Sequence, residues 1–182
     1  MVFYYDKQVR YSVNSLIAAI ERAHSNVIID LASSLEDVYV KAGNIRSRGE
    51  TCVVAFSLLT TMLTKEFFLS NLVNLVKDLR SKGCITIIGG PHATGDPLGS
   101  LKTLGFDYVF IGEGEDSLTE FVLELQHNGD PKRVKGLAYI EGDKFVFTGR
   151  RRRLDLNNYD PFPYWRGIFQ PVEITRGCPY GC

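Results

Sequence analysis

The residues Cys84-Ile-Thr-Ile-Ile-Gly-Gly-Pro-His92 decide how this sequence folds. A continuous apolar and largely β-branched run, residues 84–88, leads directly into two adjacent glycines. Such an uninterrupted run is typical of a parallel strand that is buried on both faces. Adjacent glycines let the backbone approach a ligand, or another backbone, without a Cβ atom in the way. The stretch therefore predicts a buried strand that ends in a loop of close approach.

The same alternation of strand and helix extends on both sides of this stretch. Residues 65–82 place apolar side chains at three- and four-residue spacing, which predicts an amphipathic helix that Gly83 ends. Further strands are expected at residues 2–5, 26–30, 51–56 and 108–111, helices at 12–24, 96–104 and 117–127, and one irregular helix at 33–48. Repeated units of this kind imply a parallel sheet that helices cover on both faces. The flavodoxin-like strand order 2-1-3-4-5 fits five such units.

After Gly129 the pattern changes. Residues 137–140 and 144–148, joined across Glu141-Gly-Asp143, predict a β-hairpin. A basic run, Arg150–Arg153, is expected to be a solvated face, and residues 154–165 have the Asn, Asp, Pro and aromatic content of a linker. We therefore expect a Rossmann-like α/β domain with five parallel strands over residues 1–130, a hairpin and linker over 131–165, and the start of another domain over 166–182.

Composition excludes several classes of protein. Lys plus Arg and Asp plus Glu balance at 21 each, which gives no sign of a nucleic-acid or membrane-surface partner. The longest apolar runs are far too short for a membrane span, and the first residues have no signal-peptide pattern, so a cytoplasmic location is expected. Cys52 and Cys84 each stand beside an apolar run and are interpreted as small core residues.

Three loops could carry the chemistry, because ligands of open parallel sheets bind outside the carboxyl ends of the strands. The candidate binding residues are Ser57, Leu58 and Thr60 after the third strand, Gly89, Gly90, Pro91 and His92 after the fourth, and Gly112, Glu113 and Gly114 after the fifth. Glycines at successive strand ends favour a large, flat or elongated ligand over ordinary turns.

A dinucleotide does not fit these loops. The run Gly112-Glu-Gly-Glu-Asp-Ser117 lacks the third glycine of the dinucleotide fingerprint and puts three carboxylates where a pyrophosphate would lie. Residues 6–11, after the first strand, contain no glycine, which argues against NAD and FAD. The same loop has no hydroxyl before Tyr11, which also disfavours a flavodoxin-like FMN site.

Two stretches, Ile87-Ile-Gly-Gly-Pro-His-Ala-Thr94 and Phe106-Asp-Tyr-Val-Phe-Ile-Gly-Glu-Gly-Glu115, resemble the paired signature of B12-binding domains in radical-SAM proteins. The resemblance covers about residues 13–127 and implies that the three loops hold the lower, nucleotide side of cobalamin. Many cobalamin domains carry Asp-x-His-x-x-Gly after the first strand, and residues 6–11 contain no histidine. The resemblance therefore implies cobalamin bound without that ligand, and His92 is interpreted as a hydrogen-bonding loop residue.

At the C-terminus, Arg176-Gly-Cys-Pro-Tyr-Gly-Cys182 resembles the entry to a radical-SAM cluster loop. That family's Cys-x-x-x-Cys-x-x-Cys pattern places three thiolates on a 4Fe–4S cluster and leaves the fourth iron for S-adenosylmethionine. Cys178 and Cys182 match the first two, and the third would fall at position 185. The resemblance implies a B12-dependent radical-SAM enzyme whose barrel follows in cis. A non-catalytic ligand-binding or interaction module is the alternative.

Overall fold

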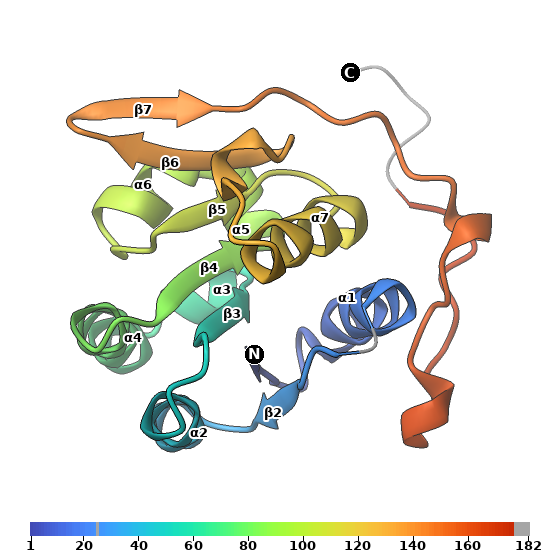
Figure 1. Ribbon diagram of the computed structural model, residues 1–182, viewed down its shortest axis with the longest axis horizontal. Coiled ribbons are helices and arrows are strands. Elements are labelled where there is room, and N and C mark those ends of the chain that lie inside the picture. The colour runs from blue at the N-terminus through green and yellow to red at the C-terminus, as the bar shows by residue number, and fades with distance from the viewer. Residues whose placement is uncertain (25, 177–182) are drawn as a thin grey trace.

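The computed structural model describes residues 1–24 and 26–176. In this part of the chain one sheet has the order β2-β1-β3-β4-β5-β6-β7. Its strands are β1 (Val2–Tyr4), β2 (Asp30–Ala32), β3 (Val53–Ser57), β4 (Ile85–Gly89), β5 (Tyr108–Phe110), β6 (Leu137–Glu141) and β7 (Lys144–Phe147). The first five are parallel, which confirms the predicted order. The predicted hairpin forms and joins the sheet as an antiparallel edge (Figure 1).

Helices cover both faces of the sheet. On one face lie α1 (Arg10–Ala23) and α7 (Glu115–Gln126), and on the other lie α2 (Leu35–Ser47) and α4 (Glu66–Ser81) (Figure 1). The shorter helices are α3 (Thr60–Leu63), α5 (Pro91–Gly95) and α6 (Pro97–Lys102), with single 3-10 turns at Pro131–Arg133, Leu156–Asn158 and Tyr164–Arg166. No helix in residues 1–24 and 26–176 is long and apolar enough to cross a membrane.

The pattern of α4 is the clearest link between sequence and packing. Leu72, Leu75, Val76 and Leu79 are all buried beneath it, as their spacing predicts. Burial of one such side chain stabilises the fold by roughly 1.5–3 kcal/mol. Gly83 adopts a φ of +75°, which glycine reaches without steric cost, and so ends the helix where predicted.

Two expected elements are wrong in detail. The second strand is Asp30–Ala32 rather than residues 26–30, and Ile28 in the apolar run before it is 64% exposed. The pairing of Val2 with Asp30 sets this register, which local apolar content did not reveal. The segment expected to be irregular contains the regular helix α2, whose first turn is capped by the Ser34 side chain accepting from the Asp37 amide at 3.1 Å.

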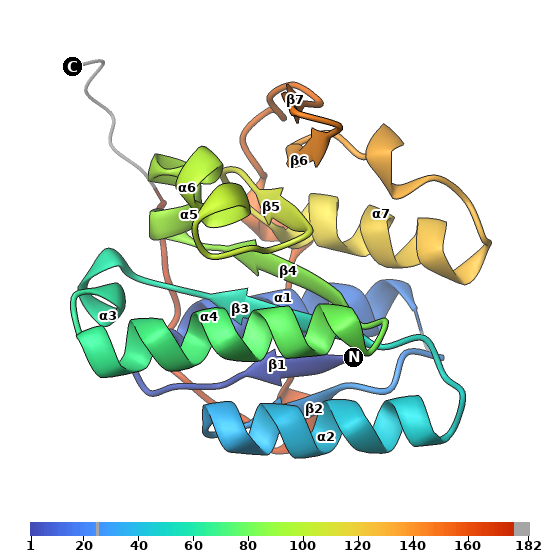
Figure 2. The ribbon, with the colours of Figure 1, turned by 90° about the vertical axis from the view of Figure 1, so that its left-hand side faces the viewer.

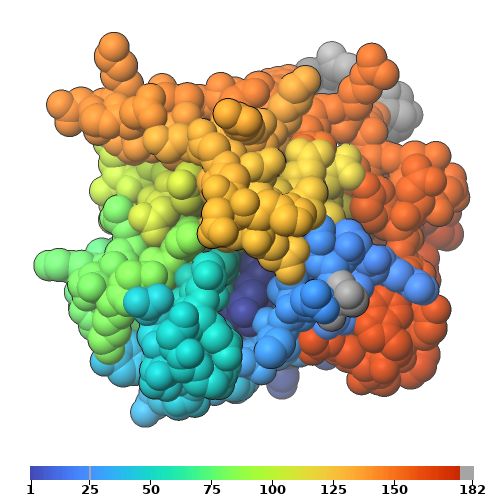
Figure 3. Space-filling view, viewed as in Figure 1, coloured from blue at the N-terminus to red at the C-terminus, as the bar shows by residue number. Residues whose placement is uncertain are grey.

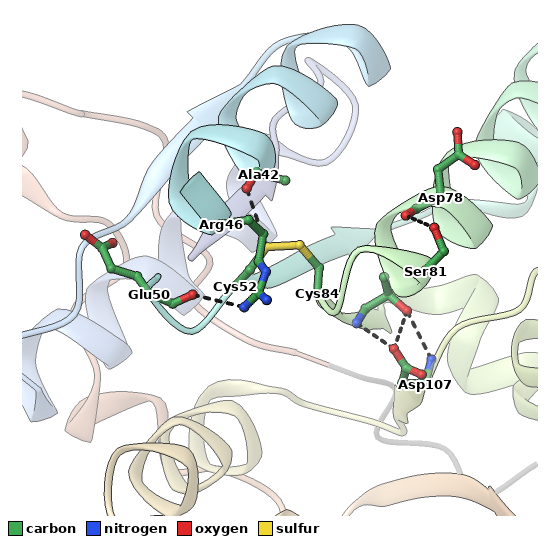
Figure 4. Close-up of a disulfide and its surroundings, with 9 residues drawn as sticks. Ala42, Arg46, Glu50, Cys52, Asp78, Ser81, Cys84 and Asp107 are labelled. Carbon is green, nitrogen blue, oxygen red and sulfur yellow. Dashed lines mark hydrogen bonds between the residues drawn. A yellow bond between two sulfur atoms is a disulfide. The ribbon is translucent and has the colours of Figure 1, made fainter. Parts of the chain in front are cut away.

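The amino ends of β3 and β4 are tied together by a disulfide. Cys52 and Cys84 are buried, as expected, but they are bonded to each other rather than standing as separate core thiols (Figure 4). The Ile85 amide donates to the Cys52 carbonyl at 2.8 Å. Cys84, the residue before Ile85, therefore lies close to Cys52 on the neighbouring strand. The pairing of β3 with β4 brings the two cysteines together although they are 32 residues apart in the sequence.

Asp107 fixes the start of β4 against β5. One carboxylate oxygen accepts hydrogen bonds from the Thr86 amide and hydroxyl, both at 2.8 Å, and the other accepts from Arg80 Nε at 2.7 Å. Thr86 is fully buried. Without Asp107 the Thr86 amide and hydroxyl would lose the acceptor that they share.

Asp107→Ala is therefore expected to lower the free energy of unfolding by about 2–3 kcal/mol, because buried donors left unsatisfied cost this much. Urea unfolding followed by circular dichroism measures the effect. The control is Asp143→Ala, at the exposed turn between β6 and β7, which should change stability by less than about 0.5 kcal/mol. Equal stabilities of the two variants would contradict this role for Asp107.

Candidate functional site

A cavity of about 230 Å³ lies between the sheet and the helices α1 and α7, at the carboxyl ends of the strands. The sheet contributes Phe3, Ala55, Ser57, Ile87, Gly89 and Phe110, the helices contribute Ser12, Ser15, Leu16, Glu115 and Leu118, and the β5–α7 loop contributes Gly112, Glu113 and Gly114. Register explains why the sheet residues share a face, because Ala55 pairs with Ile87 and Ser57 with Gly89. The lining of the cavity is mostly apolar and also includes hydroxyls and carboxylates.

The loops after β3 and β4 form one hydrogen-bonded unit beside the cavity. The Leu58 amide donates to the Gly89 carbonyl at 3.2 Å, and the His92 amide donates to the Leu58 carbonyl at 3.2 Å. The Ser57 hydroxyl lies 3.1 Å from that of Ser12, which ties the β3 loop to α1. The position of each loop therefore depends on the other.

The paired glycines have different roles. Gly90 has a φ of +91°, and a Cβ there would lie 2.9 Å from Ser57 Oγ and 3.1 Å from the Leu58 carbonyl oxygen. Gly90 thus permits close approach of its own loops. A Cβ on Gly89 would meet only Phe110, at the ordinary distance of 3.7 Å, on the sheet face that lines the cavity. Gly89 is the glycine whose missing side chain keeps the cavity open.

Six of the ten predicted binding residues line the cavity: Ser57, Gly89, Gly90, Gly112, Glu113 and Gly114. Leu58 lies fully buried and is not part of the lining. Thr60, Pro91 and His92 are also outside it, and the His92 Nδ1 atom lies 3.3 Å from the Thr60 hydroxyl. That contact agrees with the interpretation of His92 as a hydrogen-bonding residue. Cys178 and Cys182 lie outside the described residues.

Sequence reasoning missed the wall of the cavity that α1 supplies. Ser12, Ser15 and Leu16 line the cavity from this helix, and Ser15 is buried. Two serines within an apolar helix face were an available signal, because polar residues there imply a partner or a cavity. The first turn of α1 contains no acidic residue and no side-chain cap, so its free amides suit an anionic group.

Glu115, Glu173 and Arg176 close one side of the cavity. Glu115 begins α7 and forms an ion pair with Arg176, whose Nε also lies 2.6 Å from Glu173. Nearby, burial and a hydrogen bond to Asp116 raise the pKa of Tyr159 well above its ordinary value, so this phenol stays a neutral donor. Residues from the far C-terminal part thus complete a site that the sheet begins.

The segment expected to be a linker lies along α1. Arg22 bonds Asp160 at 2.7 Å and the Tyr164 hydroxyl at 2.8 Å, and its guanidinium lies 4.7 Å from the centre of the Trp165 ring. Glu21 accepts from the Trp165 indole at 2.7 Å. Figure 3 shows this orange-to-red segment packed against the blue of α1. The chain is thereby led back to the carboxyl end of the sheet, where Figure 2 shows it passing.

The part of the chain that forms the sheet and its helices is similar to known sequences. Residues 8–122 match the family model described as the B12 binding domain. An uncharacterized methyltransferase, sll1242, of Synechocystis sp. is 28% identical over 62% of this chain and 19% of its own length. The anaerobic magnesium-protoporphyrin IX monomethyl ester cyclase of Cereibacter sphaeroides is 28% identical over 68% of this chain and 23% of its own length. The chain thus spans about a fifth of these relatives.

Solved structures with the same fold include two radical S-adenosylmethionine enzymes. TsrM from Kitasatospora setae, a methyltransferase, superposes with a TM-score of 0.65 at 16% identity, over 81% of this chain and 30% of its own. The cobalamin-dependent enzyme OxsB superposes with a TM-score of 0.64 at 14% identity, over 89% of this chain and 23% of its own. At these identities the likeness concerns the fold.

Proposed function

Because the chain belongs to the B12-binding domain family, we propose that it is the cobalamin-binding part of a radical-SAM enzyme. One observation carries the proposal beyond the family. The segment that lines the cavity with Glu173 and Arg176 runs, in sequence, directly into Cys178-Pro-Tyr-Gly-Cys182. A cluster held by these cysteines would therefore stand next to the cobalamin site, as a reaction that uses both cofactors requires.

The lining of the cavity supports its proposed role as the site for the nucleotide tail of cobalamin. Its apolar faces suit the aromatic base of the tail, and the hydroxyls of Ser12, Ser15 and Ser57 suit the polar groups that link the base to the corrin. The uncapped start of α1 suits the phosphate of the tail. The start of α7 does not, because Glu115 and Asp116 occupy its first turn. The loops after β3, β4 and β5 would hold the rest of the cofactor.

We further propose that no histidine of this chain binds the cobalt. Residues 6–11, which follow β1, contain no histidine, and His92 lies against Thr60 outside the cavity lining. The cofactor supplies a cobalt centre that can carry a methyl group, and this chain's residues bind and orient its tail.

The remaining parts follow from the same proposal. Residues 1–130 would form the cobalamin domain, 131–165 the hairpin and linker, and 166–182 the beginning of the radical-SAM domain. That domain, the partner in cis, would hold the 4Fe–4S cluster through Cys178, Cys182 and a third cysteine, and would bind S-adenosylmethionine. An oxygen-sensitive cluster of this kind suits a cytoplasmic location.

The radical-SAM part is tested by cleavage of S-adenosylmethionine. After anaerobic reconstitution with iron and sulfide and reduction with dithionite, the 182-residue chain should form no 5′-deoxyadenosine, because it provides two of the three thiolates. The complete gene product should form it, and Cys178→Ala in that product should abolish it while cobalamin binding persists. If a complete, cluster-loaded protein forms no 5′-deoxyadenosine, the result would favour the non-catalytic binding module instead.

A further inference from the structure

The buried carboxylate of Glu115 has a single cationic partner in the described part of the chain. The side chain of Glu115 is 3% exposed, lines the cavity and forms its ion pair with Arg176. A carboxylate this deeply buried is strongly destabilised when its cation is removed. Glu115 therefore favours conformations in which Arg176 stays beside the cavity.

The segment that carries Arg176 has few other attachments. Val172 is 59% exposed and Ile174 is 90% exposed, so apolar contacts do little to hold these residues. The nearest attachment upstream is Gln170, which accepts a hydrogen bond from Asn14 at 2.7 Å. The second partner of Arg176, Glu173, is itself 60% exposed and belongs to the same segment, so it does not join the segment to the domain. The attachment after Gln170 thus depends on Glu115 and Arg176.

We propose that the Glu115–Arg176 ion pair is a positioning pair that fixes the segment leading to Cys178 at a set place beside the cobalamin site. The inference rests on the proposed function, because Cys178 is a cluster ligand only in a radical-SAM protein. Arg176 precedes Cys178 by two residues, and Glu115 lines the cavity that receives the tail of cobalamin. The ion pair therefore joins the segment that leads to Cys178 to the lining of the cavity.

The position of the segment can be measured directly in the full 182-residue chain. Nitroxide labels at Ile174→Cys, on the exposed segment, and at Gly43→Cys, on the exposed face of α2, report their separation by pulsed EPR in a Cys178→Ser/Cys182→Ser background. The parent should give a narrow distance distribution. Arg176→Gln and Glu115→Gln should each broaden it by at least about twofold, since a released segment samples many positions. Arg176→Lys, which keeps the charge, should restore the narrow distribution.

The coupling to the cofactor is measured by release of hydroxocobalamin. Arg176→Gln and Glu115→Gln should each speed its dissociation by about fivefold or more, because a wall of the pocket is lost. The double variant should be no faster than either single variant, as expected for two residues that act as one pair. Glu141→Gln is the matched control, because it removes a carboxylate from the exposed ion pair with Lys132, outside the cavity lining, and it should change both measurements by less than about twofold.

The outcomes separate this inference from the proposed function. Unchanged distance distributions in Arg176→Gln, or effects of the two single variants that add in the double variant, would overturn the positioning role. Absence of cobalamin binding by the parent chain would defeat the proposed function, while the distance measurement would still report on the pair. If Glu115→Gln fails to fold, Arg176→Gln carries the test, because Arg176 lies on a segment that the domain core does not need.

Discussion

Gly89→Leu is expected to weaken hydroxocobalamin binding by at least about 100-fold, or about 2.7 kcal/mol, without loss of stability. Gly89 ends β4 with ordinary strand geometry, and its Cβ position is free of close contacts. A leucine there would extend over the same sheet face as Ile87 and occupy the cavity of about 230 Å³. Glycine is itself unfavourable within a strand, so the melting temperature should stay within about 3 °C of the parent or rise.

Titration followed by the visible spectrum, with thermal melting of the ligand-free protein, tests this expectation. The control is Gly43→Leu, an equal enlargement at an exposed position of α2 with no atom within 4 Å of the new Cβ. It should leave binding unchanged. Full affinity in a folded Gly89→Leu variant would show that the ligand does not enter this cavity.

Gly90→Val should instead destabilise the domain itself, by about 2–5 kcal/mol. A positive φ costs a residue with a Cβ about 1–2 kcal/mol, and forced overpacking adds about 1–3 kcal/mol. The overpacking arises because the Cβ would press on Ser57 Oγ and on the Leu58 backbone, at 2.9 and 3.1 Å. In a chain of this length the loss corresponds to a melting temperature lower by roughly 4–20 °C.

Gly112→Val separates the two causes. Gly112 has nearly the same φ, +89°, but no atom lies within 4 Å of its Cβ position. Gly112→Val should lower the free energy of unfolding by only about 1–2 kcal/mol, which is the cost of the positive φ alone. Urea unfolding of the two ligand-free variants measures the difference. Equal losses would mean that the contact between the β3 and β4 loops contributes nothing.

The adjacent glycines show how far the sequence predicts the site. Their position after a buried strand indicates a place of close approach, and both line the cavity. What the pair approaches depends on backbone dihedral angles and on the loop after β3, some 30 residues earlier in the chain, which no local pattern contains. In the structure, Gly90 permits close contact between the loops after β3 and β4, whereas Gly89 leaves space for the cavity.

Contacts between distant segments are the part that sequence reasoning could not supply. The sequence places Glu115 just before the helix expected at 117–127, and in the structure Glu115 is the first residue of α7, which begins two residues earlier than expected. Its pairing with Arg176, 61 residues later, depends on the path of the linker along α1. The Cys52–Cys84 disulfide has the same origin, since the β3–β4 register brings the two residues together. By contrast the parallel strand order followed from apolar runs and right-handed crossovers alone.

The most direct test of the whole account is titration of the purified chain with hydroxocobalamin, followed by EPR of the Co(II) form. The absence of histidine at residues 6–11 and the contact of His92 with Thr60 predict binding without nitrogen splitting from a protein histidine. Splitting of that kind would contradict the proposed coordination and implicate His92. No binding with protein at tens of micromolar would contradict the central claim that the cavity between the sheet and the helices α1 and α7 is a cobalamin site.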